Sequence, residues 1–168
     1  MLAAALIVTA CGAHARKPPP PAALPPLTQA FANPAIGASG PLPADWSAIK
    51  APGFVQLRAR DGNALIVIAS SGKSRSASEL VATWVATIRK TYTSVTLERA
   101  VRARLGGLPA HSQVVYGSNR RKVPLRILVA GASGKRVNYV LEAFTALHVP
   151  LHDLVEAQQT VYALRLTG

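Results

Sequence analysis

The chain has 168 residues, which suffices for one domain and a tail, and 49% of them are hydrophobic, so a buried core is possible. It carries 19 Lys and Arg against 7 Asp and Glu, and this net charge of +12 favours polyanionic partners. The single cysteine excludes a disulfide and a thiolate metal site from the folded part, and seven acids leave little material for paired-carboxylate catalysis.

The first ten residues predict an export signal that ends at Cys11. Residues 1–10 are uncharged and mostly apolar, which is typical of a signal-peptide core and is too short for a membrane span of ~20 residues. The segment Val8-Thr9-Ala10-Cys11 resembles the lipobox of bacterial lipoproteins, where an aliphatic residue and two small ones precede an acylated cysteine. The resemblance implies palmitate or a similar chain on Cys11 and anchoring in a membrane of the cell envelope, facing the periplasm.

Two alternatives remain open at this end of the chain. No Lys or Arg precedes the apolar run, so a true start upstream of Met1 is one of them. Ala13-His14-Ala15 offers an A-x-A cleavage site, and processing after Ala15 would give a secreted or periplasmic protein. In either case we expect no nucleic-acid partner, because an exported chain does not meet the chromosome. Gly12, where an inner-membrane retention signal would have Asp, favours the outer membrane.

Residues 11–43 are rich in Pro and Ala, including the run Pro18 to Pro21. Proline removes a backbone donor and fixes φ, so such a segment is typical of an extended polyproline II spacer and not of a helix or a sheet. We predict a disordered linker over residues 11–43 and a folded domain over residues 44–168.

The first half of this domain predicts a hairpin and a helix. Residues 54–58 and 64–69 are strand candidates joined by a tight turn. Ser76 and Glu79 have the spacing of a capping box, in which each side chain bonds the other residue's backbone N–H. A single apolar stripe follows and predicts a helix to about Thr91.

The second half predicts four more strands and a second helix. Alternating hydrophobic residues mark strands at 95–105, 112–116, 123–130 and 137–143. Residues 151–163 follow Pro150 with a helical stripe, and Leu164-Arg165-Leu166 forms a final short strand. This order predicts the α+β class, with an antiparallel sheet of about six strands flanked by two main helices.

The order of elements, Trp46 before the hairpin and the bend Leu105-Gly106-Gly107-Leu108-Pro109-Ala110 resemble the PsbP-like family, which includes DcrB-like proteins. The resemblance covers residues 43–166. It implies a sheet flanked by helices and partner binding without catalysis, and it transfers no site residues.

Two short segments invite a phosphate-binding interpretation that their spacing excludes. Gly72-Lys73-Ser74 and Gly134-Lys135-Arg136 follow strands, as the end of a Walker A loop does. The motif needs a glycine five positions before its second glycine, where Val67 and Val129 stand. Both segments are better interpreted as connectors between strands.

Metal and catalytic sites are not predicted. His148, His152 and Glu156 lie four residues apart, but Pro150 is expected to open the helix between the two histidines. No G-x-S-x-G elbow is present, and no cofactor is expected. A pocket that gathered His111 or His148 with an acid would instead favour a hydrolase.

The remaining feature is a set of basic residues on predicted strands and turns. We expect these side chains to form a face that contacts an acidic envelope protein or anionic headgroups, although outward strand residues are ordinarily polar in any case. The candidates are Arg102, Arg104, Arg120, Arg121, Lys122, Arg126 and Arg136. The function predicted is a non-catalytic binding or accessory module of the envelope. An accessory subunit that docks through a sheet edge, or a hydrolase, is the alternative.

Overall fold

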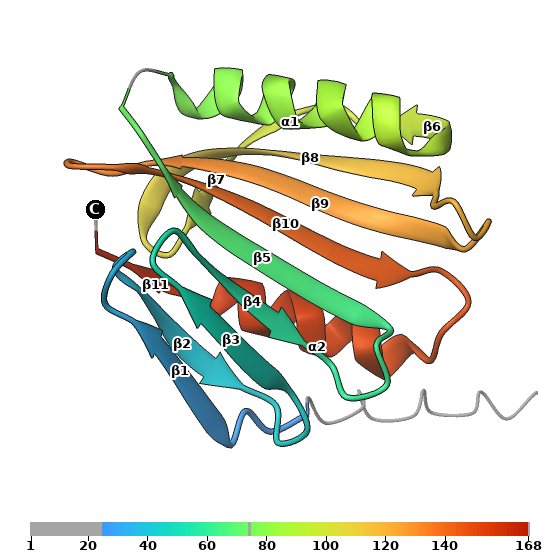
Figure 1. Ribbon diagram of the computed structural model, residues 1–168, viewed down its shortest axis with the longest axis horizontal. Coiled ribbons are helices and arrows are strands. Elements are labelled where there is room, and N and C mark those ends of the chain that lie inside the picture. The colour runs from blue at the N-terminus through green and yellow to red at the C-terminus, as the bar shows by residue number, and fades with distance from the viewer. Residues whose placement is uncertain (1–24, 74, 168) are drawn as a thin grey trace, which may run out of the picture.

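The computed structural model describes residues 25–73 and 75–167, and it has a large and a small sheet with two helices (Figure 1). The predicted signal, Cys11 and the cleavage site after Ala15 lie outside the described residues. The elements are β1 (Gln29–Asn33), β2 (Ala38–Leu42), β3 (Ser47–Ala51), β4 (Phe54–Arg58), β5 (Ala64–Ser71), α1 (Ala77–Thr91), β6 (Thr93–Leu97), β7 (Val101–Leu105), β8 (Leu108–Ser118), β9 (Pro124–Ser133), β10 (Asn138–Ala146), α2 (Leu151–Tyr162) and β11 (Arg165–Leu166).

The large sheet is antiparallel and has eight strands, in the order β3-β4-β5-β10-β9-β8, with β6 and β7 both on the outer edge of β8. The sequence predicted one strand over residues 95–105, and this prediction is wrong. Leu97 and Val101 are four positions apart in the chain. Their pairing partners on β8, Val115 and Ser112, are only three positions apart. The extra residue interrupts the ladder, as in a β-bulge, and two strands result.

The two helices pack on opposite faces of this sheet (Figure 1). α1 lies over β8, β9 and part of β10, while α2 packs on β10 and β5 from the other side, beside the three-stranded sheet β1-β2-β11. β9 therefore has a buried face on each side: Ile127 and Val129 contact α1, and Ala130 and Ala132 contact the other layer. The predicted α+β class with two main helices is confirmed, although the sheet has more than the six strands expected.

The helix ends agree with the sequence analysis. The Ser76 hydroxyl accepts from the Glu79 N–H at 3.3 Å, and the Glu79 carboxylate accepts from the Ser76 N–H at 2.7 Å. These bonds to Ser76 hold the pKa of Glu79 below its usual value. α2 begins after Pro150, as predicted. Within the described ranges, neither helix is long and apolar enough to cross a membrane.

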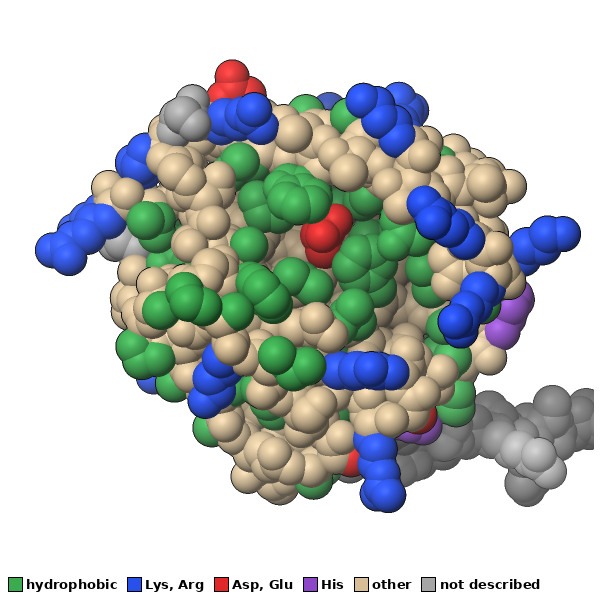
Figure 2. Space-filling view, viewed as in Figure 1, with side chains coloured by type: hydrophobic (Ala, Val, Ile, Leu, Met, Phe, Trp, Pro, Cys, Tyr) green, Lys and Arg blue, Asp and Glu red, His purple; other side chains and the backbone are tan. Residues whose placement is uncertain are grey.

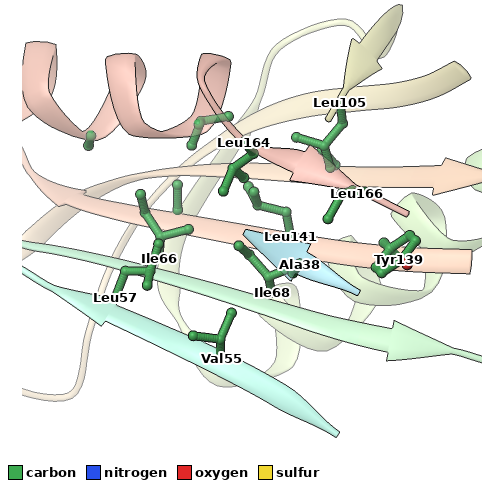
Figure 3. Close-up of a cluster of buried hydrophobic side chains, with 14 of the residues drawn as sticks. Ala38, Val55, Leu57, Ile66, Ile68, Leu105, Tyr139, Leu141, Leu164 and Leu166 are labelled. Atoms are coloured by element: carbon green, nitrogen blue, oxygen red, sulfur yellow. The ribbon is translucent and has the colours of Figure 1, made fainter. Parts of the chain in front are cut away.

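The larger core lies between the large sheet and the layer of α2 and the small sheet (Figure 3). Side chains from β4, β5 and β10 point toward the chain ends that form the small sheet. They include Val55, Leu57, Ile66, Ile68, Tyr139 and Leu141, opposite Ala38, Leu164 and Leu166. The Tyr139 hydroxyl donates to the Thr167 carbonyl at 2.9 Å, which ties the C-terminal strand to the sheet.

The fold begins earlier in the chain than the sequence analysis predicted. β1 and β2 lie inside residues 11–43, the segment expected to be a disordered linker, and β3 was not predicted. The prolines do not prevent pairing because Pro34 lies in the turn between β1 and β2, and Pro41 lies beyond the two residues of β2 that pair with β11. Phe31 and Leu42 are buried, so the small sheet is part of the domain.

Candidate functional site

The seven basic candidates do not form one continuous surface. Arg120, Arg121 and Lys122 lie in the turn before β9, whereas Arg136 lies in the turn after it. A ten-residue strand is about 33 Å long, so these two groups lie at opposite ends of the sheet. Arg102 lies in a third place, near the start of α1 beside His111. Arg120 and Arg121 line an open depression beside Tyr92, and Arg104 and Arg126 line a second, more enclosed cavity.

This cavity has a volume of about 240 Å³ and lies between β7, β8, β9 and the C-terminal part of α2. Arg126 supplies its charge, and Ser112 and Gln158 supply neutral polar groups. Arg104 lines the cavity as part of β7, but its exposed side chain alternates with those of Ala103 and Leu105, which pack on the larger core, and so lies on the other face of the sheet. The rest of the lining is apolar or aromatic: Ala103, Leu105, Val114, Leu128, Ala130, Val161 and Tyr162. We refer to it as the Arg104–Arg126 cavity.

Strand register explains why Arg126 faces this cavity. Arg126 lies opposite Tyr116 on β8 and Thr145 on β10, on the face of the sheet that α2 covers. α2 packs on β10 and β5, so the Arg126 end of β8 and β9 is left partly open. Arg126 is half-buried there and also lines a neighbouring cavity of about 160 Å³ with Leu147 and Leu154.

Hydrogen bonds hold the groups around the two arginines. The Tyr116 hydroxyl donates to the Glu98 carboxylate at 2.6 Å, and this bond is the main cause of the raised pKa of Tyr116, which Arg126 opposes. The Arg104 guanidinium donates to the Gly107 carbonyl at 2.5 Å, next to the bend after β7. Chemically, the cavity combines an apolar wall with the guanidinium group of Arg126, an arrangement that suits an anion attached to an apolar body.

Both arginines were predicted from the sequence as contact residues, but the cavity was not. Alternation placed Leu125, Ile127 and Val129 inward, which is correct for the α1 face, and treated the Arg126 face as solvent. However, Leu128 and Ala130, on the same face as Arg126, pack on the larger core. An uninterrupted apolar run from Ile127 to Ala130 is the signal of a strand buried on both faces, and it is present in the sequence.

The other sequence candidates take no part in a site. The Trp46 indole N–H donates to the Glu156 carboxylate at 3.0 Å, and His152 contacts Asp153 at 2.9 Å. No three His, Cys, Asp or Glu side chains in residues 25–73 and 75–167 are placed to hold a metal ion. The depression beside His111 is lined by Ser76, Ser78, Arg102 and Ser133, so it does not gather the acid that a hydrolase would need.

The two glycine segments also have structural roles. Gly131 lies within β9, where a Cβ would come 2.4 Å from the Ala77 carbonyl oxygen, so it permits α1 to cross the sheet closely. Lys73 donates to the Gly134 carbonyl at 2.5 Å, which joins the loop after β5 to the turn after β9. The Lys73–Gly134 contact agrees with the interpretation of Gly72-Lys73 and Gly134-Lys135 as connectors, whereas Gly131 belongs to β9 itself.

No protein-family model and no curated protein matches this sequence. Its structure is similar to the cyanobacterial PsbP (CyanoP) of Synechocystis sp. PCC 6803, with a TM-score of 0.60 and 14% identity over 82% of this chain and 91% of that one. The fold is PsbP-like. LpqN, involved in cell envelope biogenesis of Mycobacterium tuberculosis, has a TM-score of 0.55 and 16% identity over 78% of this chain and 83% of LpqN.

A protein of Bacteroides thetaiotaomicron VPI-5482 has a TM-score of 0.58 and 10% identity, over 85% of this chain and 50% of that one. The PsbP-like domain predicted from the bend at Gly106 and the order of elements is therefore confirmed as a fold. At these identities the likeness extends to the arrangement of strands and helices only.

Proposed function

We propose that this PsbP-like domain is a non-catalytic binding module of a bacterial cell envelope, and that its Arg104–Arg126 cavity holds an anionic headgroup with part of an apolar chain. One observation carries the proposal: the half-buried guanidinium group of Arg126 faces a cavity whose other walls are mainly apolar. Guanidinium groups pair with carboxylates and phosphates through charge-assisted, often bidentate hydrogen bonds.

The size of the cavity favours a headgroup over an acidic protein. Its volume of about 240 Å³ lies just below the ~300–1,000 Å³ of sites that enclose drug-sized ligands. A stable protein interface buries roughly 800 Å² on each partner, most of it outside any single cavity. A small anionic group with one chain fits these limits, and the net charge of +12 would increase its rate of encounter.

The envelope location rests on three independent features. Residues 1–11 resemble a signal and lipobox, Pro-rich sequence follows Cys11 before the fold begins, and a protein of the same fold is involved in envelope biogenesis. Lipid anchoring at Cys11 would place the cavity within reach of anionic headgroups. We propose the outer membrane, because Gly12 follows the cysteine.

Titration of the purified full chain with dodecyl phosphate, below its micelle concentration, tests the binding site. We expect saturable binding that weakens about tenfold in Arg126→Gln, equivalent to ~1.4 kcal/mol, and that is unchanged in Arg104→Gln, because the Arg104 side chain lies on the other face of the sheet. Arg136→Gln removes the same charge in the turn at the opposite end of β9 and is expected to bind normally. Equal weakening in all three variants, measured by calorimetry, would show diffuse attraction to a basic protein and contradict the proposal.

A further inference from the structure

The opposite face of the large sheet is only half covered. α1 lies over β8, β9 and part of β10, and β5, β4 and β3 continue beyond it. On this open part, register aligns Glu142 of β10, Val67 of β5, Gln56 of β4 and Ile49 of β3 in one row across the sheet. The row is a direct continuation of the surface on which α1 packs, because Glu142 lies opposite Val129 of β9.

The side chains around this row are mostly apolar. Phe54 and Ile49 are 38% and 55% exposed, and Phe144 and Trp84 are half-buried at the border with α1. Figure 2 views this face and shows an acidic side chain in a hollow ringed by hydrophobic side chains, with Lys and Arg further out. We call the surface formed by Ile49, Phe54, Val67, Trp84, Glu142 and Phe144 the Glu142 hollow.

Glu142 is the unusual member of this surface. Burial alone raises the pKa of its carboxyl group, with no nearby cation acting in the opposite direction. Tyr92, which follows the last residue of α1, stacks on Phe144, and its pKa is raised first by burial and then by the charge of Glu142. Arg58, in the next row, makes no ion pair with Glu142 among the described residues. A half-buried carboxylate without a partner is costly, and a cationic ligand would remove that cost.

We propose that the Glu142 hollow binds a cationic amphiphile, a molecule with one apolar chain and an ammonium or guanidinium group, with the cation paired to Glu142 and the chain along the apolar floor. The ligand is expected to be a cation because its charge is complementary to that of the Glu142 carboxylate. This site is distinct from the Arg104–Arg126 cavity, which lies on the other face of the sheet and has the opposite charge.

The dimensions of the hollow favour a single chain over a protein partner. Four strands at ~4.8 Å spacing span about 14 Å, and three rows of side chains cover a similar length along the strands. The floor is therefore about 200 Å², well below the roughly 800 Å² that each partner contributes to a stable interface. One alkyl chain can cover such a floor, while a protein would have to rest mainly on surfaces outside it.

The net charge of the protein makes the test selective. A chain with a charge of +12 repels cations in general, so saturable binding of a cationic amphiphile requires a local acidic site. The experiment is a titration of the full chain with dodecylamine, below its micelle concentration, followed by calorimetry and by amide chemical shifts. We expect shifts confined to β4, β5, β10 and the end of α1.

Two charge-matched variants decide the outcome. Glu142→Gln is expected to weaken dodecylamine binding at least fivefold, in line with the loss of a charged hydrogen bond, and to leave dodecyl phosphate binding unchanged. Asp45→Asn removes the same charge at an exposed position and is expected to have no effect. The proposal fails if dodecylamine does not bind, if Glu142→Gln binds it equally well, or if sedimentation shows a dimer in which a second copy covers this face.

Discussion

Glu142 is a residue whose position lowers the stability of the protein at neutral pH. Its pKa is raised in the folded state, so the folded chain holds this proton more tightly than the unfolded chain, where the ordinary value is about 4.5. Stability is therefore lost as the pH rises from about 4.5 through the raised pKa. The stability that is lost in this pH range is the free-energy cost of placing a negative charge in an apolar surface.

Replacement of Glu142 by Gln, which stays neutral, should raise the melting temperature at pH 7.5. We expect a gain of up to about 1 kcal/mol, because the carboxylate is only half-buried and solvent screens it. The gain should shrink toward zero at pH 4, where the glutamate itself is protonated in both states. Thermal unfolding followed by circular dichroism at both pH values checks this, and a constant difference between the two would contradict it.

At the scale of single residues, the sequence predicted the chemical role of a side chain better than its place in the fold. Ser76, Glu79 and the Gly106-Gly107 bend behave as predicted because their roles depend on neighbours within a few residues. Arg104 and Arg126 were among the predicted contact residues, but the cavity that they line depends on the pairing of β7, β8 and β9 and on where α2 packs. The spacing of residues along the sequence does not predict that arrangement.

Among the elements, the contact of α1 with β9 depends on one missing side chain. A Cβ on Gly131 would lie 2.4 Å from the Ala77 carbonyl oxygen and 3.2 Å from the Leu80 Cβ. The helix would have to move away from the sheet, since the first of these contacts is with backbone. The same displacement would loosen the core formed by Val81, Val85 and Val129.

Gly131→Ala should therefore destabilise the protein by roughly 1–3 kcal/mol, the usual cost of overpacking. Gly72→Ala is the control, because nothing lies within 4 Å of a Cβ at that position. Urea unfolding of both variants measures the difference. Equal stability of the two would mean that α1 tolerates displacement from the sheet.

Local composition explains why β4 and β5 were predicted from the sequence and why β1, β2 and β3 were not. The runs at 54–58 and 64–69 are strongly apolar and alternate, so β4 and β5 were found. β1, β2 and β3 contain Gly, Pro, Ser and Lys and lie next to a Pro-rich segment, so local composition indicated a linker. They form strands because Phe31, Ala38 and Leu42 are buried against the larger core. Tertiary burial outweighed local preference.

For the whole molecule, the proposed location rests on Cys11, which carries the only thiol of the chain. We expect cells that express the full chain to incorporate labelled palmitate into it and to retain it in the membrane fraction. Cys11→Ser should abolish the labelling and release the protein, because a serine cannot form the thioether that lipidation requires. An unlabelled, soluble wild-type chain that keeps Met1 would contradict both the anchoring and the export.

The three-stranded sheet joins the beginning of the folded chain to its end. β2 pairs on one side with β1 and on the other with β11, only two residues before the last described residue. This sheet cannot be completed until residue 166 is available, so a chain leaving a ribosome or a translocation pore stays open until β11 has emerged. A domain whose small sheet is closed last, by β11, is well suited to transport in the unfolded state.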